Sequence, residues 1–176
     1  MSKEQHTLTK RLDDLKFEIE RSIQYCDYRI FFWQFLSKMA QFLEFITSSA
    51  AFILLFQNGT TMAHILIAIT AVVSILVFIL DATKNARHNM EKMSKFTKLF
   101  VKVPVVYDKV TEKQYEIWCT ERYEIDNDGS THIPCLSVIC HNDICLRKGI
   151  DDDHPLSRFE RTIGKYFPFP YRSRRT

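Results

Sequence analysis

The run MAHILIAITAVVSILVFIL, residues 62–80, decides how the rest of the chain is interpreted. It contains no Asp, Glu, Lys or Arg. As a helix it would be roughly 28 Å long, close to the hydrocarbon thickness of a bilayer. A turn sequence, QNGTT (57–61), precedes it, and a second apolar run at 36–56 lies before that turn. The pattern predicts a two-pass transmembrane helical hairpin over residues 36–81. The alternative is a buried helical hairpin within a soluble protein, although a core helix seldom needs apolar residues on every face.

The composition outside this hairpin narrows the class of protein. The net charge of +3 is too small to indicate a nucleic-acid-binding protein by itself. The first 30 residues hold six basic and six acidic groups, unlike a secretory signal peptide. An odd number of cysteines and no such leader predict reduced thiols in a cytosolic setting. The cysteines are Cys26, Cys119, Cys135, Cys140 and Cys145.

Residues 1–58 contain neither Gly nor Pro, which permits one very long helix. Thr7 or Thr9 is expected to cap it, and apolar residues at helical spacing give its first part an apolar stripe. Since such a helix is much longer than a bilayer is thick, residues 1–35 are predicted to form a cytosolic or interfacial helix. Its aromatic residues are expected to form a belt at the membrane interface. The residues of this belt are Tyr25, Tyr28, Phe31, Phe32, Trp33 and Phe35.

Polar residues on the first apolar run follow one face of the expected helix. Five are three or four positions apart, and a lysine lies beside them. These residues are Gln34, Ser37, Lys38, Gln41, Glu44 and Ser48. A carboxylate inside a bilayer tends to face a bundle interior or a water-filled cavity. The stripe therefore predicts a pore lining or a subunit interface in a high-order homo-oligomer. The alternative is that Lys38 and Glu44 extend to the lipid headgroups at the end of the helix.

A basic segment, residues 82–103, continues the second apolar run without Gly or Pro. By the positive-inside rule, this segment and the basic N-terminal arm predict that both termini lie on the cytoplasmic side of the bacterial inner (plasma) membrane. The cations from Lys84 to Lys102, with the basic tail at 167–176, also predict weak contact with RNA or anionic lipid. A solvated basic face is the alternative.

The C-terminal region, residues 104–176, is expected to be small, helical and cytosolic. Pro104 should end the preceding helix, and further helices are predicted over 105–122 and 134–148, the second closed by Gly149. A short last helix should start after Asp153 or His154, which would cap it, and stop at Gly164. The chain is thus predicted to be all-α. Its four predicted parts are residues 1–35, 36–81, 82–103 and 104–176.

Signals for catalysis or metal binding are few. Cys135, Cys140 and Cys145 lie five residues apart, which separates neighbouring thiols by about 140° around a helix. They are therefore expected to be small core residues and not ligands of one metal. The sequence contains no P-loop, GxSxG or HExxH motif and no paired-carboxylate site. No catalytic residue, metal or cofactor is predicted.

Arg147 and His154, with six residues between them, resemble the R-X4-6-H signature of HEPN ribonucleases. The resemblance implies that the pair acts on RNA at a dimer interface. Lys148 stands where that family usually has Asn, Asp or His, and Gly149 interrupts the helix between the two residues. We therefore predict that the pair is not catalytic, and keep a membrane-anchored HEPN-like ribonuclease as the main rival function.

The whole layout resembles the small membrane effectors of prokaryotic antiviral defence. The SLATT two-transmembrane effectors share the hairpin. The accessory membrane proteins of type VI-B CRISPR systems share the size, the hairpin and a degenerate R-X-H motif, here Arg147 and His154. The resemblance implies an oligomeric pore that permeabilises or depolarises the inner membrane and enhances RNA-guided CRISPR defence against phage, with an RNA-guided CRISPR effector as partner. A non-catalytic membrane scaffold is a further alternative.

Overall fold

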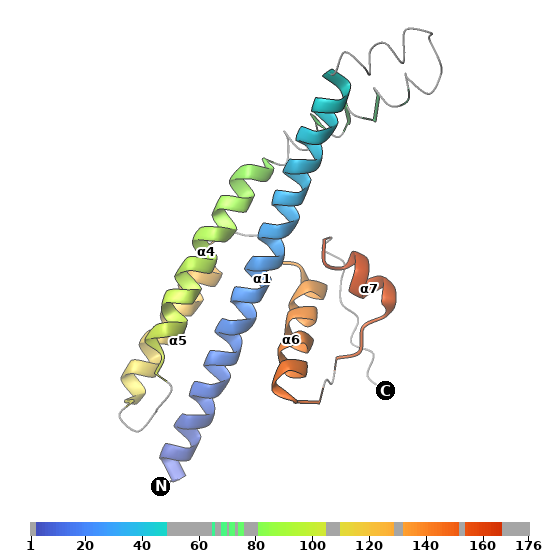
Figure 1. Cartoon of the computed structure of the whole chain (residues 1–176). Helices are drawn as coiled ribbons and strands as arrows, with labels where there is room; N and C mark the ends of the chain where they lie inside the picture. Colours follow the sequence, from blue (N-terminus) through green and yellow to red (C-terminus); the bar gives the residue numbers. More distant parts are fainter. Residues whose placement is uncertain are drawn as a thin grey trace, which may run out of the picture. The chain divides into compact units, whose positions relative to one another are not determined.

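The computed structural model describes residues 3–48, 81–104, 110–128, 132–151 and 154–166, and a few residues between 65 and 75. Its helices are α1 (Lys3–Ser48), α4 (Ala82–Lys102), α5 (Glu112–Asp126), α6 (Pro134–Lys148) and α7 (Arg158–Ile163) (Figure 1). No strand occurs in this part of the chain, so the all-α prediction is confirmed. The chain divides into two compact units, unit 1 with residues 1–28 and 90–176 and unit 2 with residues 29–89.

The main core of unit 1 lies where α1, α4 and α5 pack together (Figure 1). On α1 the buried residues repeat at helical spacing, which gives the helix one apolar face. Phe96 and Leu99 of α4 and Ile125 of α5 meet that face, and burying each such side chain is worth about 1.5–3 kcal/mol. The residues that α1 contributes are Leu12, Leu15, Ile19 and Cys26.

The helix α6 packs on α1 through a second buried cluster, formed by Ile133, Leu136 and Cys140 with two tyrosines of α1. The backbone N–H of Ile133 donates to the hydroxyl of Tyr25 at 2.9 Å, and the hydroxyl of Tyr28 donates to a carboxylate oxygen of Asp143 at 3.0 Å. Burial raises the pKa of the Cys140 thiol to about 12. The two tyrosine hydrogen bonds, at the edge of this buried cluster, thus fix how α6 lies on α1.

The ends of α6 match the prediction, because each is encoded by a residue whose backbone preferences suit that position. Pro134 stands in the first turn, and Gly149 closes the helix in the left-handed conformation, with φ of 67°. Three cysteines of α6 are buried, which confirms that they are core residues. They are Cys135, Cys140 and Cys145, and none of them forms a disulfide.

Other predicted helix ends are wrong. The long helix α1 begins at Lys3, so neither Thr7 nor Thr9 caps it, and the hydroxyl of Thr9 instead donates to the carbonyl of Gln5 at 2.9 Å. The first turn of α5 follows Thr111, which forms a capping box with Gln114, whereas the sequence predicted a start at residue 105. Residues 105–109 lie outside the described part of the chain.

The last helix also begins later than predicted. Ser157 is the N-cap of α7 and forms a capping box with Glu160, so His154 does not cap this helix, and Asp153 lies outside the described residues. The helix does end at Gly164, as predicted. Gly164 is buried close to Cys135 of α6, which places the end of α7 against α6.

The predicted two-pass transmembrane hairpin over 36–81 is wrong for the residues that the structure describes. None of the helices there is both long and apolar enough to cross a membrane. The helix α1 is long, but only residues 36–48 of the first apolar run lie in it, and they include Lys38 and Glu44. Most of residues 62–80 lie outside the described part. The correction extends to the predictions that depended on this hairpin. They are the inner-membrane localisation, the placement of both termini relative to that membrane, and the membrane pore.

Candidate functional site

Unit 2 contains a small buried cluster that orients its part of α1. Trp33 of α1 is buried against Ala82 and Ala86 of α4, with Phe32 and Leu36 packed around them. The small alanine side chains allow the backbone of α4 to approach the indole closely. The guanidinium of Arg29 lies 5.0 Å from the centre of the Trp33 ring, within the range of a cation–π interaction. This cluster determines which face of α1 points away from α4 in unit 2.

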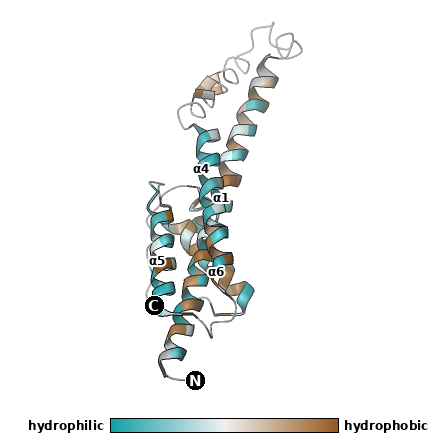
Figure 2. Cartoon of the chain, turned by 90° about the vertical axis from the view of Figure 1, so that its left-hand side faces the viewer, coloured by the Kyte–Doolittle hydropathy of each residue, from teal (hydrophilic) through white to brown (hydrophobic). Residues whose placement is uncertain are grey.

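That opposite face of α1 exposes a row of large apolar side chains, which we call the aromatic face. Figure 2 colours the ribbon by hydropathy and shows hydrophobic and hydrophilic residues alternating along α1. Phe31 is 65% exposed, Phe35 54%, Phe42 57% and Phe45 73%, and Met39 at 38% borders them. The Phe residues are separated by four, seven and three positions, so they lie along one side of the helix. The rings of Phe31 and Phe35 are stacked, with their centroids 6.4 Å apart.

The aromatic face is as extensive as the largest apolar patch of a typical monomer. A phenylalanine carries roughly 200 Å² of accessible surface, so the exposed fractions give roughly 500 Å² of apolar surface on one side of α1. The largest apolar patch on a typical monomer is about 300–600 Å², and a patch of that size is often functional. Unit 2 also contains a second group of half-exposed apolar residues. This group consists of Ile65, Ile69, Val72 and Ile75.

The predicted polar stripe lies on the same helix. Gln34 and Ser37 are half-buried, and Lys38 and Gln41 are exposed. Glu44 and Ser48 belong to α1, but their side chains lie outside the described part of the structure, so the prediction that the six residues line a subunit interface stays a prediction. At 100° per residue, Lys38 lies within about 60° of every Phe of the aromatic face. A cation therefore stands in the middle of the apolar surface.

The sequence contains a signal for the aromatic face, although the membrane interpretation divides its residues between two features. It places Phe31 and Phe35 in a membrane-interface belt, and Phe42 and Phe45 in an apolar run. α1 is one helix that also carries the charged residues Arg29 and Lys38. On such a helix, the spacing of the four phenylalanines places them on a single face.

The HEPN-like residues Arg147 and His154 make contacts with different partners. Arg147, on α6, donates to the side-chain carbonyl of Gln24 at 2.8 Å and lies 3.5 Å from Glu20. The ring of His154 lies 5.1 Å from that of His141, and its backbone carbonyl accepts from the Asn142 amide at 2.7 Å. These contacts tie α6 to α1 and to the segment after α6. That the pair is not catalytic stays a prediction.

Several cations of the basic segment Lys84–Lys102 take part in contacts within unit 1. Lys92 donates to the carbonyl oxygen of Asp126 at 3.0 Å, Lys95 lies 3.6 Å from Asp128, and Lys102 pairs with Glu121. Weak RNA or lipid contact through this segment stays a prediction. Within the described ranges, no group of three or more His, Cys, Asp or Glu side chains is arranged to hold a metal ion.

Comparison of the chain with known protein families, with curated proteins and with solved structures gave no match.

Proposed function

We propose that the protein is a non-catalytic helical module that self-associates through the aromatic face of α1. The observation that carries the proposal is the exposure of four phenylalanines along one side of this helix. Each would lose an unfavourable apolar contact with water on association, at about 25 cal/mol for every Å² buried. Exposed aromatic side chains are also the residue type most enriched at protein interfaces.

The extent of the aromatic face fits contact with a second copy of the chain. Two copies that cover each other's face would bury roughly 1,000 Å² in total, which reaches the lower limit for a specific interface. Most homo-oligomers contain two-fold interfaces, in which the same patch of each copy contacts the other. A face that is to pair with itself must therefore be self-complementary.

The spacing of the phenylalanines has this property. Phe31 and Phe35 lie seven and three positions before Lys38, and Phe42 and Phe45 lie four and seven positions after it. In an antiparallel pair of α1 helices with a two-fold axis near Lys38, Phe31 of one copy would lie beside Phe45 of the other. Phe35 would likewise lie beside Phe42. Packing of aromatic pairs in this arrangement adds about 0.5–1.5 kcal/mol per pair beyond the buried area.

Lys38 would lie near the axis in this arrangement. Its aliphatic stem can cover the neighbouring rings while its ammonium group stays in water. Two such groups close to each other repel, which limits the strength of association and disfavours registers that would bury them. A single lysine within an otherwise apolar face is thus compatible with a specific, reversible interface.

The proposal is tested by sedimentation equilibrium of the full chain over a range of concentrations. The wild type should associate, and the double variant Phe35→Ala/Phe42→Ala should remain monomeric at concentrations where the wild type is dimeric. Phe159→Ala is the matched control, because Phe159 is 58% exposed but lies on α7 in unit 1. A wild type that is monomeric throughout, or a double variant that associates as the wild type does, would refute the proposal.

A further inference from the structure

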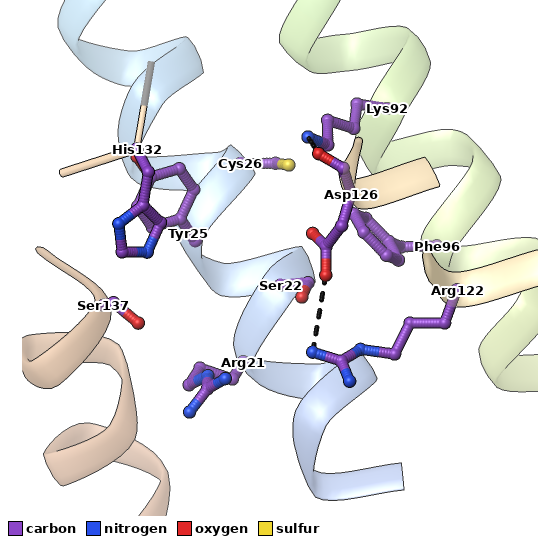
Figure 3. A pocket seen from close by; sticks show the side chains of 10 residues that line it. All are labelled: Arg21, Ser22, Tyr25, Cys26, Lys92, Phe96, Arg122, Asp126, His132 and Ser137. Atoms are coloured by element: carbon purple, nitrogen blue, oxygen red, sulfur yellow. Dashed lines mark hydrogen bonds and ion pairs between the residues drawn. The ribbon is translucent and has the colours of Figure 1, made fainter. Parts of the chain in front are cut away.

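Unit 1 contains a partly open cavity of about 290 Å³, lined by both polar and apolar side chains, between α1, α4, α5 and the start of α6 (Figure 3). Its inner wall is apolar, formed by the fully buried ring of Phe96 and the buried thiol of Cys26. Its other walls carry polar side chains from segments that are far apart in the sequence. The volume is close to the lower end of the range for small-molecule sites, about 300–1,000 Å³.

The charged residues that line the cavity, together with the one that contacts them from outside, are mostly cations. Arg21 comes from α1, Lys92 from α4 and Arg122 from α5, and the carboxylates close to them are Asp126 and Glu18. Three cations against two carboxylates leave one net positive charge in a partly buried place. Lys92 is buried and donates to the backbone carbonyl of Asp126, so its charge lies beside the cavity.

Arg122 has hydrogen-bonding capacity left at this site. Its Nη2 donates to Glu18 at 2.8 Å and lies 3.4 Å from Asp126, the contact drawn in Figure 3. Its Nε is buried and has no hydrogen-bond partner, one of very few side-chain atoms in the described part of the chain of which this is true. Leaving such a donor without an acceptor costs about 1–3 kcal/mol. An acceptor supplied from the cavity would remove that cost.

The other polar side chains that line the cavity are mostly donors or can act as donors. Ser22 and Ser137 contribute hydroxyl groups, and the rings of Tyr25 and His132 lie parallel along one wall with their centroids 6.0 Å apart (Figure 3). An oxyanion with several acceptor oxygens satisfies such a set, and arginine recognises phosphate through paired N–H groups. The flat rings offer a surface for an organic group attached to it.

From these observations we infer that the cavity is a binding site for a small phosphate ester. The phosphate is held by Arg122 and Arg21, with Lys92 compensating its second negative charge, and the organic part lies against Tyr25 and His132. Asp126 is partly exposed, so its carboxylate can turn to solvent when the phosphate enters. All of these residues belong to unit 1, so the inference is independent of the self-association proposed for α1 in unit 2.

The test is calorimetric titration of the full chain with ribose 5-phosphate, ribose and inorganic phosphate, alongside ³¹P line broadening. Ribose 5-phosphate should bind, inorganic phosphate should bind more weakly, and ribose should not bind. Arg122→Gln should weaken binding about tenfold or more, as expected for loss of a charge-assisted hydrogen bond. Lys98→Gln, which removes an exposed cation of α4 outside the cavity, should change it less than about twofold.

If Arg122→Gln does not fold, as judged by circular dichroism, Arg21→Gln gives the decisive comparison and should also weaken binding. Equal binding of ribose and ribose 5-phosphate, or no binding of any phosphate by the wild type, would overturn the inference. An effect of Lys98→Gln as large as that of Arg122→Gln would indicate nonspecific electrostatic attraction of the ligand, and would also overturn the inference. Tight binding of a short RNA with ribose 5-phosphate inactive would assign the basic residues to a nucleic-acid surface instead.

Discussion

Replacing Gly164 with alanine should detach α7 from α6. Gly164 has an ordinary helical φ of −61°, so the space around it, and not its φ, decides what a side chain there costs. A Cβ atom at this position would lie 2.8 Å from the Cβ of Cys135 and 2.4 Å from the carbonyl oxygen of Glu160. Carbon atoms normally pack at about 3.5–4.0 Å, so α7 would have to move away from Cys135 by roughly 0.7 Å or more. The turn between Glu160 and Gly164 would also have to open, because the clash with Glu160 lies within α7 itself.

The cost of forcing an extra methyl group into a packed site is about 1–3 kcal/mol. No residue of α7 itself is buried, so the helix can leave α6 more cheaply than unit 1 can unfold. The expected result is local. Amide hydrogen exchange in residues 158–164 should accelerate about tenfold for each 1.4 kcal/mol of cost, whereas the protection of α1 and α4 should stay the same.

Gly149→Ala is the matched control, since the space around Gly149 is open but its φ is 67°. Alanine there should cost about 1 kcal/mol through backbone strain at the end of α6, and Gly149→Asn should cost less. Hydrogen exchange followed by mass spectrometry distinguishes the two mechanisms. If Gly164→Ala exchanges at residues 158–164 as slowly as the wild type, the packing argument is wrong.

Three further predictions concern the thiol of Cys140, the charge of Lys38 and the carboxylate of Glu18. Burial raises the pKa of Cys140 to about 12, so between about pH 9 and 12 only the unfolded chain loses this proton. The free energy of unfolding should therefore fall by up to about 1.4 kcal/mol per pH unit in this range, and urea titrations should show no such contribution in Cys140→Ala. Lys38→Met should tighten self-association about tenfold by removing like charges near the proposed axis, and an unchanged dissociation constant in sedimentation would place Lys38 away from the interface. Glu18→Gln should strengthen binding of ribose 5-phosphate about threefold, because Glu18 accepts from both Arg21 and Arg122; calorimetry that shows no change would mean that these guanidinium groups do not contact the ligand.

Local sequence was sufficient where the backbone preference of one residue decides the end of a helix. Pro134 and Gly149 mark the ends of α6 because proline suits the first turn of a helix and glycine the left-handed position after it. The absence of Gly and Pro before residue 59 likewise predicted the long helix α1. The capping boxes of Thr111 and Ser157 were equally local signals that the prediction overlooked.

The functional surfaces depended on information that a single stretch does not contain. Apolar residues at 36–48 have the same composition in a membrane helix and in a helix that pairs with a copy of itself, so composition could not choose between them. The cavity was not predictable, because Arg21, Lys92 and Arg122 come together only when three helices pack. Resemblance in layout to defence-associated membrane proteins relied chiefly on the hairpin, and participation in an RNA-guided response stays a prediction.

Disulfide trapping of Lys38→Cys in the full chain tests the self-association of α1 most directly. A two-fold axis near residue 38 brings the two introduced thiols to within the distance that a disulfide can bridge, about 4.4–6.8 Å between Cα atoms. Mild oxidation should therefore give a covalent dimer in high yield, and Lys98→Cys, on the exposed surface of α4, should give little. Equal yields from the two variants, or no dimer from Lys38→Cys at concentrations where the chain associates, would contradict pairing through the aromatic face.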